Sequence, residues 1–380
     1  MRRCRLKPER ADKRILIQRN GAHGDILMAT PLLTALRDAY PHAHLTWLVE
    51  YKEAATVDAH PYLDELIIWD SAYWKKLLRH ALYPLYLTQA ARLRKLLKAR
   101  QYDVFISFQP EEWGYLVAEG CGAPMRIGIF DTYREFNGDT ETSANTRRYT
   151  DSFVFEDHPP HRTDQYLLPL KVLGLPDPPE KRMTMGYTVT DAAAAERLAA
   201  EMGIADTPYV TIAPMTTWSS RCWSARNFAA LADALQDAGY PVVLIGSAKE
   251  RLPIENVAEE MRQRPLIAAG VLSFRELAAF LDRAALVISG DTGPMHLAAA
   301  VDTPFLALFG PTPPDRFAPL SGRQRVLHHP VPCAPCYKKD CPLTGDDHHL
   351  CIRKIRVPEA IEAARELLVG ATVKREASGR

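Results

Sequence analysis

The sequence predicts an α/β protein made of two Rossmann-like, doubly wound parallel sheets, each covered by helices. Three observations predict this class: short apolar segments alternate with helical ones, the alternation occurs twice, and a proline-rich stretch separates the two series. Continuous apolar runs are typical of strands buried on both faces of a parallel sheet. A chain of 380 residues is long enough for two domains with separate cores.

The first series begins with an expected buried strand at residues 14–19 (RILIQR), followed by a glycine-containing turn. A helix is expected from about residue 25 to residue 40, with Pro31 near its first turn, where proline is tolerated. The next expected strands are residues 44–50 (HLTWLVE) and 102–107 (YDVFIS).

A proline-rich stretch at residues 157–180 predicts the junction between a domain spanning residues 1–180 and one spanning residues 181–356. A C-terminal helix and tail are expected at residues 357–380. The expected elements of the second series are strands 209–213, 241–246, 285–289 and 304–309 and helices 225–237 and 250–262. We expect a ligand cleft at the carboxyl ends of the strands.

The composition excludes several classes of protein. The chain has 47 basic and 46 acidic residues, a net charge of +1, and 47% hydrophobic residues. These values exclude a disordered chain and a coiled coil, and they disfavour a nucleic-acid-binding protein. The sequence shows neither a signal peptide nor an apolar run of about 18 residues. Seven cysteines are too few and odd in number for a disulfide scaffold, so we expect a cytoplasmic protein with reduced thiols.

The segment 287–320 (VISGDTGPMHLAAAVDTPFLALFGPTPPDRFAPL) carries the most informative motif. A strand is expected to end just before a turn containing Asp291, Thr292 and Gly293, and a helix follows. The N–H groups at a helix start, together with the Thr292 hydroxyl, form an anion site suited to a diphosphate. We expect His296 to point toward the same site, whereas Asp291 alone could equally be a helix cap.

A second segment, 213–228 (APMTTWSSRCWSARNF), follows an expected strand end, where ligand-binding loops lie in parallel sheets. Thr216 and Thr217 offer hydroxyl donors, and Arg221 offers a permanent cation whose planar guanidinium matches phosphate. The alternative for Arg221 is an ordinary surface charge. Trp223 is expected to anchor the loop on the core.

The third segment, 21–31 (GAHGDILMATP), turns sharply after the first strand and puts Asp25 at a helix start. Asp25 is either a plain helix cap or a general base for a substrate hydroxyl. His23 is a weaker candidate in the same turn. The G-x-x-G spacing lacks the third glycine of a dinucleotide-binding fingerprint, so the sequence does not predict NAD binding.

Together the three segments resemble the signature regions of glycosyltransferase family 9, the ADP-heptose:lipopolysaccharide heptosyltransferases. The resemblance runs from about residue 14 to the C-terminal helix, and its DTGPMH motif is highly specific. It implies a GT-B fold, in which two Rossmann-like domains face a central cleft and bind the acceptor and the sugar nucleotide. It also implies inverting transfer of a heptose from ADP-L-glycero-D-manno-heptose to an inner-core lipopolysaccharide sugar.

The resemblance also implies roles for individual residues. Asp25 stands at the family's proposed catalytic base and would accept the proton of the acceptor hydroxyl. Arg221, where many members have lysine, and the helix start at Gly293 would stabilise the charge on the departing ADP. The other expected donor-binding residues are Thr216, Thr217, Asp291, Thr292 and His296. No cofactor is expected for catalysis, because an Asp-X-Asp motif does not accompany the donor segment.

Alternative functions remain at this point. A member of the same family could heptosylate a protein such as an autotransporter, or another glycan. A sugar-nucleotide epimerase of similar shape would need acid and base groups on both faces of the sugar, and the sequence does not reveal such a set. A non-catalytic nucleotide-sugar binder would have no use for the base at Asp25.

Four cysteines are closely spaced in the pattern C-x2-C-x4-C-x9-C: Cys333, Cys336, Cys341 and Cys351. Four thiolates suit a structural zinc or iron ion, and His348 or His349 could replace one of them. Free thiols in a loop are the alternative. The resemblance adds that similar clusters occur in part of the family and hold iron in relatives that glycosylate autotransporters.

Residues 75–100 contain eight Lys or Arg and no acidic residue, interleaved with Leu and Tyr. This pattern predicts a helix that contacts an anionic membrane or acceptor phosphates, with a solvated helical face as the alternative. Because acceptors of the resembled family sit in the inner membrane, we expect peripheral attachment there. Arg126, Arg134 and Arg162 are further candidates for acceptor contacts, and each could instead be a surface ion-pair partner.

Overall fold

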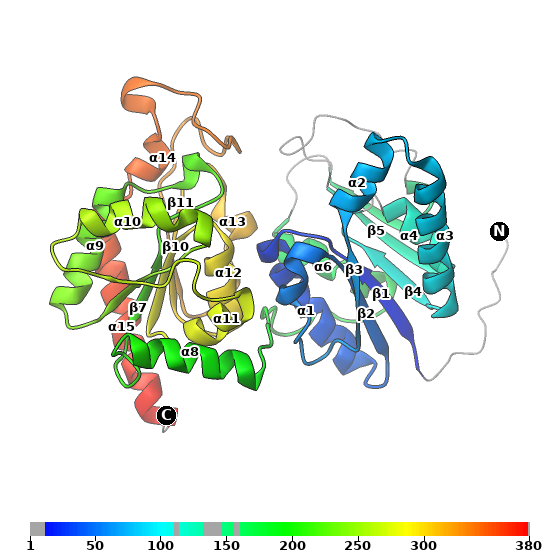
Figure 1. Cartoon of the computed structure of the whole chain (residues 1–380), viewed down its shortest axis with the longest axis horizontal. Coiled ribbons are helices and arrows are strands. Elements are labelled where there is room, and N and C mark those ends of the chain that lie inside the picture. Colours follow the sequence, from blue (N-terminus) through cyan, green and yellow to red (C-terminus); the bar gives the residue numbers. More distant parts are fainter. Residues whose placement is uncertain (1–11, 110–113, 132–145, 156–159, 379–380) are drawn as a thin grey trace. The chain divides into compact units, whose positions relative to one another are not determined.

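The computed structural model describes residues 12–109, 114–131, 146–155 and 160–378 (Figure 1). The chain divides into two compact units, Met1–Glu180 and Lys181–Arg380. Arg134 lies outside the described residues. Among the described residues, no helix combines the length and the apolar character needed to cross a membrane.

The sheet of the first unit has six strands, all parallel, in the order β3-β2-β1-β4-β5-β6. The strands are β1 (Arg14–Gln18), β2 (His44–Glu50), β3 (Glu65–Trp69), β4 (Val104–Ser107), β5 (Met125–Asp131) and β6 (Asp151–Phe155). This is the Rossmann order, and it reverses between β1 and β4. Ile15 pairs with Leu45 on one side and Val104 on the other, so β1 lies at the centre of the sheet.

Helices of the first unit connect these strands, and two more follow the last strand. They are α1 (His23–Ala39), α2 (Ser71–Arg79), α3 (Tyr83–Ala99), α4 (Gly114–Cys121), α6 (Arg162–Leu167) and α7 (Pro169–Val172), with a 3-10 turn η1 (Tyr51–Thr56). Pro31 lies in the middle of α1 and not near its first turn, so that prediction was wrong. The Thr30 hydroxyl donates a 2.7 Å hydrogen bond to the Leu27 carbonyl, which Pro31 cannot serve because it has no N–H.

The second unit repeats this topology. Its strands are β7 (Val210–Ala213), β8 (Val242–Leu244), β9 (Leu266–Ile267), β10 (Leu286–Gly290), β11 (Phe305–Phe309) and β12 (Gln324–His328). All pair in parallel, in the order β12-β11-β10-β7-β8-β9, so the order reverses between β7 and β10. Two doubly wound parallel sheets were predicted, and the structure confirms them.

Helices of the second unit pack on both faces of its sheet (Figure 1). They are α8 (Val189–Glu201), α9 (Ala225–Asp237), α10 (Arg251–Glu259), α11 (Phe274–Asp282), α12 (Gly293–Ala300), α13 (Pro314–Phe317), α14 (Leu350–Arg353) and α15 (Val357–Ser378), with 3-10 turns η2 (Ser219–Arg221), η3 (Ala248–Glu250) and η4 (Gly345–Asp347). Ala360, Ala364 and Leu368 of α15 belong to the core of this unit. Trp223 is buried in the same core and donates a 3.0 Å hydrogen bond to the Ile355 carbonyl, which confirms its predicted anchoring role.

Candidate active site

Asp25 lies in the first turn of α1, just beyond the carboxyl end of β1 and at the switch point of the first sheet. The N-cap of α1 is Ala22, so Asp25 is not the helix cap. Its Oδ1 accepts a 2.9 Å hydrogen bond from the Tyr166 hydroxyl, and its Oδ2 lies 2.7 Å from a guanidinium nitrogen of Arg19. Arg162 approaches Oδ1 to 3.7 Å. Three polar side chains therefore fix one carboxylate at the expected ligand-binding edge.

The surroundings of Asp25 keep it ionised. Burial alone would raise the pKa of this carboxyl, but Arg19, Arg162 and the Tyr166 hydroxyl lower it to about 2. Burial raises the pKa of Tyr166, which keeps its hydroxyl protonated and able to donate. A quarter of the Asp25 side chain remains exposed, so a ligand can approach it.

Of the two other predicted site residues in the first unit, His23 lies in the same helix turn as Asp25, whereas Arg126 lies in β5. His23 begins α1, and its Nδ1 lies 2.7 Å from the Thr56 hydroxyl. Burial lowers the pKa of His23 to about 4, so its ring is neutral at neutral pH. Arg126 lies near the amino end of β5, and its guanidinium donates to the carbonyls of Ala123 and Arg148. Asp25 follows the carboxyl end of β1, whereas Arg126 lies at the amino end of a strand parallel to β1. The two residues therefore lie at opposite ends of the strands of this sheet.

Asp291 follows β10 at the switch point of the second sheet. It is not the cap of α12, because the N-cap position is Thr292. The Asp291 carboxylate is buried, accepts a 2.6 Å hydrogen bond from the Thr312 hydroxyl and lies 3.3 Å from a nitrogen of Arg221. Asp291 therefore holds the guanidinium of Arg221 in place.

Arg221 ends η2 in the loop that follows β7. Its guanidinium stacks over the Trp218 ring at 3.7 Å and donates a 3.2 Å hydrogen bond to the Asp291 carbonyl. Stacking on one face and ion pairing on one edge restrict the guanidinium to one orientation. The structure brings Arg221 and Asp291 together, as expected for one anion-binding site.

The remaining predicted donor residues surround this pair in different ways. The Thr216 hydroxyl donates to the Trp218 carbonyl at 2.6 Å, so it shapes the loop, whereas the Thr217 side chain is exposed. Gly293 opens α12 without a side-chain cap. Pro294 has no N–H, and the Met295 N–H donates a 3.2 Å hydrogen bond to the Thr292 carbonyl, so the N–H group of Gly293 is the one in this turn left for a ligand. His296 is buried one turn further along the same helix.

Sequence reasoning missed four residues of these clusters: Arg19, Tyr166, Trp218 and Thr312. Thr312 follows the end of β11, and Asp291 follows the end of β10. A parallel pairing of these two strands would have placed the two residues next to each other. Tyr166 is separated from Asp25 by 141 positions, and the sequence near Tyr166 offers nothing that would reveal the contact.

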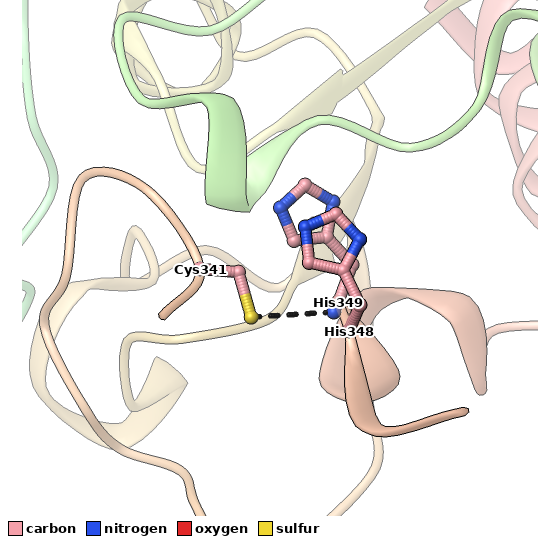
Figure 2. A group of neighbouring side chains, drawn as sticks. All are labelled: Cys341, His348 and His349. Atoms are coloured by element: carbon pink, nitrogen blue, oxygen red, sulfur yellow. Dashed lines mark hydrogen bonds between the residues drawn. The ribbon is translucent and has the colours of Figure 1, made fainter. Parts of the chain in front are cut away.

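The cysteine segment brings one of the four predicted thiols close to both predicted histidines. Within the described residues, the ligand atoms of Cys341, His348 and His349 lie within 4.8 Å of one another (Figure 2). The two imidazole rings stack with centroids 4.1 Å apart, and the backbone N–H of His349 donates a 3.3 Å hydrogen bond to Cys341 Sγ. Cys351 is buried beside Gly310 and, like Cys333 and Cys336, is not a member of this close group.

Two doubly wound parallel sheets in one chain, each with a charged cluster at its switch point, are the architecture of the GT-B fold class. The chain belongs to glycosyltransferase family 9 (heptosyltransferase), whose family model matches residues 90–345, and it is therefore a glycosyltransferase. The resemblance seen in the sequence is confirmed.

Relatives agree with this assignment, and solved structures share the fold. Lipopolysaccharide heptosyltransferase 3 of Escherichia coli K12 is 30% identical over 76% of this chain and 80% of its own length. Lipopolysaccharide heptosyltransferase 1 of Pseudomonas aeruginosa is 30% identical over 86% of this chain and 87% of its own length. The family 9 glycosyl transferase from Veillonella parvula has a TM-score of 0.79 at 24% identity, covering 94% of this chain and 98% of that chain. Escherichia coli heptosyltransferase WaaC with ADP has a TM-score of 0.64 at 23% identity, covering 83% and 93%.

Proposed function

We propose that this chain transfers a heptose from ADP-L-glycero-D-manno-heptose to an inner-core sugar of lipopolysaccharide, with inversion at the anomeric carbon. One observation carries the proposal: a member of a heptosyltransferase family has an ionised Asp25 at one switch point and an oriented Arg221 at the other. The Asp25 carboxylate suits deprotonation of an acceptor hydroxyl, and the Arg221 guanidinium suits binding of a diphosphate.

On this proposal the second unit binds the donor. Arg221 is held by Asp291 and Trp218, so its cation is already oriented before the diphosphate arrives. The first turn of α12 adds the backbone N–H of Gly293 and the positive end of the helix dipole. Both groups stabilise the negative charge that develops on ADP as the glycosidic bond breaks. Thr217, Thr292 and His296 remain proposed donor contacts.

Asp25 is the proposed general base. A carboxylate with a pKa of about 2 has a low proton affinity, so it cannot remove a proton from a free hydroxyl. The acceptor hydroxyl becomes strongly acidic only as its oxygen bonds to the anomeric carbon. We therefore infer that Asp25 takes the proton late in bond formation, and that Tyr166 and Arg19 keep the carboxylate aimed at that oxygen.

Arg162 is the proposed acceptor contact. Its guanidinium lies beside Asp25 and suits an anionic group on the acceptor sugar. An acceptor anion that engages Arg162 would also weaken its hold on Asp25 and raise the proton affinity of the base. Arg126 is a weaker choice, because its guanidinium already serves two backbone carbonyls. His23 remains a proposed neighbour of the acceptor.

The test is incubation of the protein with the ADP-heptose and Kdo-lipid A that lacks heptose, followed by mass spectrometry of the lipid. Addition of one heptose is the expected result. Heptose found on a protein acceptor, with Kdo-lipid A unchanged, would favour the alternative function. Epimerised ADP-heptose without acceptor-dependent ADP release would contradict transfer altogether. Because the proposed acceptor is lipid-anchored, we also propose a cytoplasmic location at the inner membrane.

We propose in addition that the cysteine segment binds a structural zinc or iron ion through Cys341, His348 and His349, with a further cysteine as fourth ligand. One thiolate and two imidazoles are a donor set that these metals prefer. His349 adopts a left-handed backbone conformation with φ 55°, which is costly for residues other than glycine and asparagine, and its ring stacks on that of His348. The hydrogen bond that the His349 backbone N–H donates to Cys341 Sγ favours the thiolate form, which is the form that binds metal.

Metal analysis of the purified protein tests this second proposal. We expect about one zinc or iron per chain, lost in Cys341→Ser and His348→Ala together with part of the thermal stability. Cys121→Ala, which changes a buried thiol of the first unit, is the control and should retain the metal. Wild-type protein without metal after growth in zinc- and iron-supplemented medium would contradict the proposal.

A further inference from the structure

The helices α2 and α3 form the most unusual surface of the first unit. They pack against each other, and Figure 1 shows the pair along one side of that unit. Trp74, Leu77 and Leu97 are buried and attach the two helices to the core, with Trp74 stacked on Trp69 at 4.6 Å. Tyr86 and Leu93 are half-buried against the same core. The exposed residues of the pair define what we call the α2–α3 surface.

Large apolar side chains are concentrated on the α2–α3 surface. Of the fifteen large hydrophobic side chains that are well exposed among the described residues, seven lie between residues 73 and 96. Leu87 is 64% exposed and Tyr83 is 57% exposed. The seven residues are Tyr73, Leu78, Leu82, Tyr83, Leu85, Leu87 and Leu96. Scattered single apolar residues are ordinary, but a cluster of this size on one helix pair marks an interaction site.

Positive charge is concentrated on the same helices. Seven exposed cations lie on the α2–α3 surface: Lys75, Lys76, Arg79, Arg92, Arg94, Lys95 and Lys98. Arg100, the eighth cation of the segment, is paired with Glu65. Residues 75–100 contain no carboxylate, so the surface repels a second copy of itself and attracts an anionic partner.

We propose that the α2–α3 surface binds an anionic phospholipid bilayer directly, with its leucines and tyrosines entering the headgroup region and its cations pairing with lipid phosphates. Exposed leucines distinguish this partner from a nucleic acid, which needs cations but offers little to aliphatic side chains. This inference identifies the surface that would make the proposed membrane attachment. It rests on the proposed function for the reason why the protein binds a membrane. Binding to the lipid itself requires neither the sugar-nucleotide donor nor the sugar acceptor.

The experiment is co-sedimentation of the full chain with vesicles of phosphatidylethanolamine and phosphatidylglycerol, and with vesicles of phosphatidylcholine alone. Two triple variants are compared with wild type: Arg92→Gln/Arg94→Gln/Lys95→Gln and Leu82→Ser/Leu85→Ser/Leu87→Ser. The matched control changes an exposed cation and an exposed leucine of the second unit, Arg226→Gln/Leu252→Ser. Thermal unfolding of each variant establishes that it folds, and heptose transfer to a deacylated acceptor in solution reports separately on the proposed function.

We expect wild type and the control to bind the anionic vesicles and not the phosphatidylcholine vesicles. Each lost cation should weaken the partition coefficient about fivefold, so the cation variant should lose roughly 100-fold. Added salt should weaken wild-type binding, and the folded leucine variant should also bind less. Equal binding by folded triple variants and wild type, or no wild-type binding to anionic vesicles, would overturn the proposal. So would RNA binding that matches vesicle binding and does not change in the leucine variant.

Discussion

The hydroxyl of Tyr166 lies 2.9 Å from Oδ1 of Asp25 and donates a hydrogen bond to it, although 141 positions separate the two residues in the chain. The tyrosine comes from α6, and the aspartate from the first turn of α1. Tyr166 is almost fully buried, so its hydroxyl holds one position. The contact fixes the direction of the proposed base.

Replacement of Tyr166 by phenylalanine should lower the turnover number roughly 10- to 100-fold and leave ADP affinity unchanged. The variant removes one hydrogen bond to a charged group, a loss of about 1.5–3 kcal/mol, and keeps the aromatic packing. ADP release and calorimetry measure the two quantities. Tyr187→Phe is the control, because it also removes a tyrosine-to-aspartate hydrogen bond, to Asp282 on the second unit. A Tyr166→Phe variant as fast as wild type would exclude a positioning role.

Arg162→Gln should move the acidic limb of the kcat/KM profile to higher pH. Arg162 helps to lower the pKa of Asp25 to about 2, so its removal raises that pKa. Because the carboxylate is the active form, activity in the variant is then lost at a higher pH as the solution is acidified. Arg148→Gln, which breaks the exposed pair with Glu119, should leave the limb unchanged. An unshifted limb in Arg162→Gln would contradict the electrostatic coupling.

At Arg221, charge and geometry can be separated by two substitutions. Arg221→Gln should weaken ADP binding about 10- to 100-fold, because it removes a charged hydrogen-bond partner of the diphosphate. Arg221→Lys should lose less, since the cation is kept while the stacking on Trp218 is weakened. Isothermal titration calorimetry with ADP measures both. Equal affinities in all three proteins would show that Arg221 does not contact the donor.

His60 should make the first unit sensitive to acid. Its ring is buried, and burial lowers its pKa from 6.5 to about 4. The unfolded chain therefore binds a proton that the folded chain resists, so stability falls as the pH decreases from about 6.5 to 4. This effect reaches about 3 kcal/mol. Urea unfolding at several pH values should show a smaller decrease in His60→Gln, and an unchanged pH dependence would refute this assignment.

The fold could largely be predicted from the sequence, and the parts that were missed have a physical reason. Central strands such as β1, β7, β10 and β11 are short and mostly apolar, because both of their faces are buried. Edge strands lack this pattern: β6 alternates half-buried and exposed residues, and β9 has only two residues. Pro31 was misplaced because the Thr30 hydroxyl compensates the Leu27 carbonyl, which local proline rules do not consider.

The candidate site was also predicted only in part, because strand ends are visible in the sequence and contacts between distant segments are not. Asp25, Arg221 and Asp291 follow strand ends, so the sequence placed them at ligand-binding edges. Their partners depend on packing between distant segments. Neither the contact of Tyr166 with Asp25 nor the stacking of Arg221 on Trp218 leaves a local pattern.

The most direct test of the central claim compares wild type and Asp25→Ala for ADP binding and for ADP release from ADP-heptose, with and without Kdo-lipid A that lacks heptose. Wild type should release ADP only when the acceptor is present. Asp25→Ala should bind ADP as tightly but release it about 1,000-fold more slowly, because its general base is gone. Acceptor-dependent release at the wild-type rate by Asp25→Ala would contradict the proposed base, and failure of wild type to bind ADP would contradict the donor site.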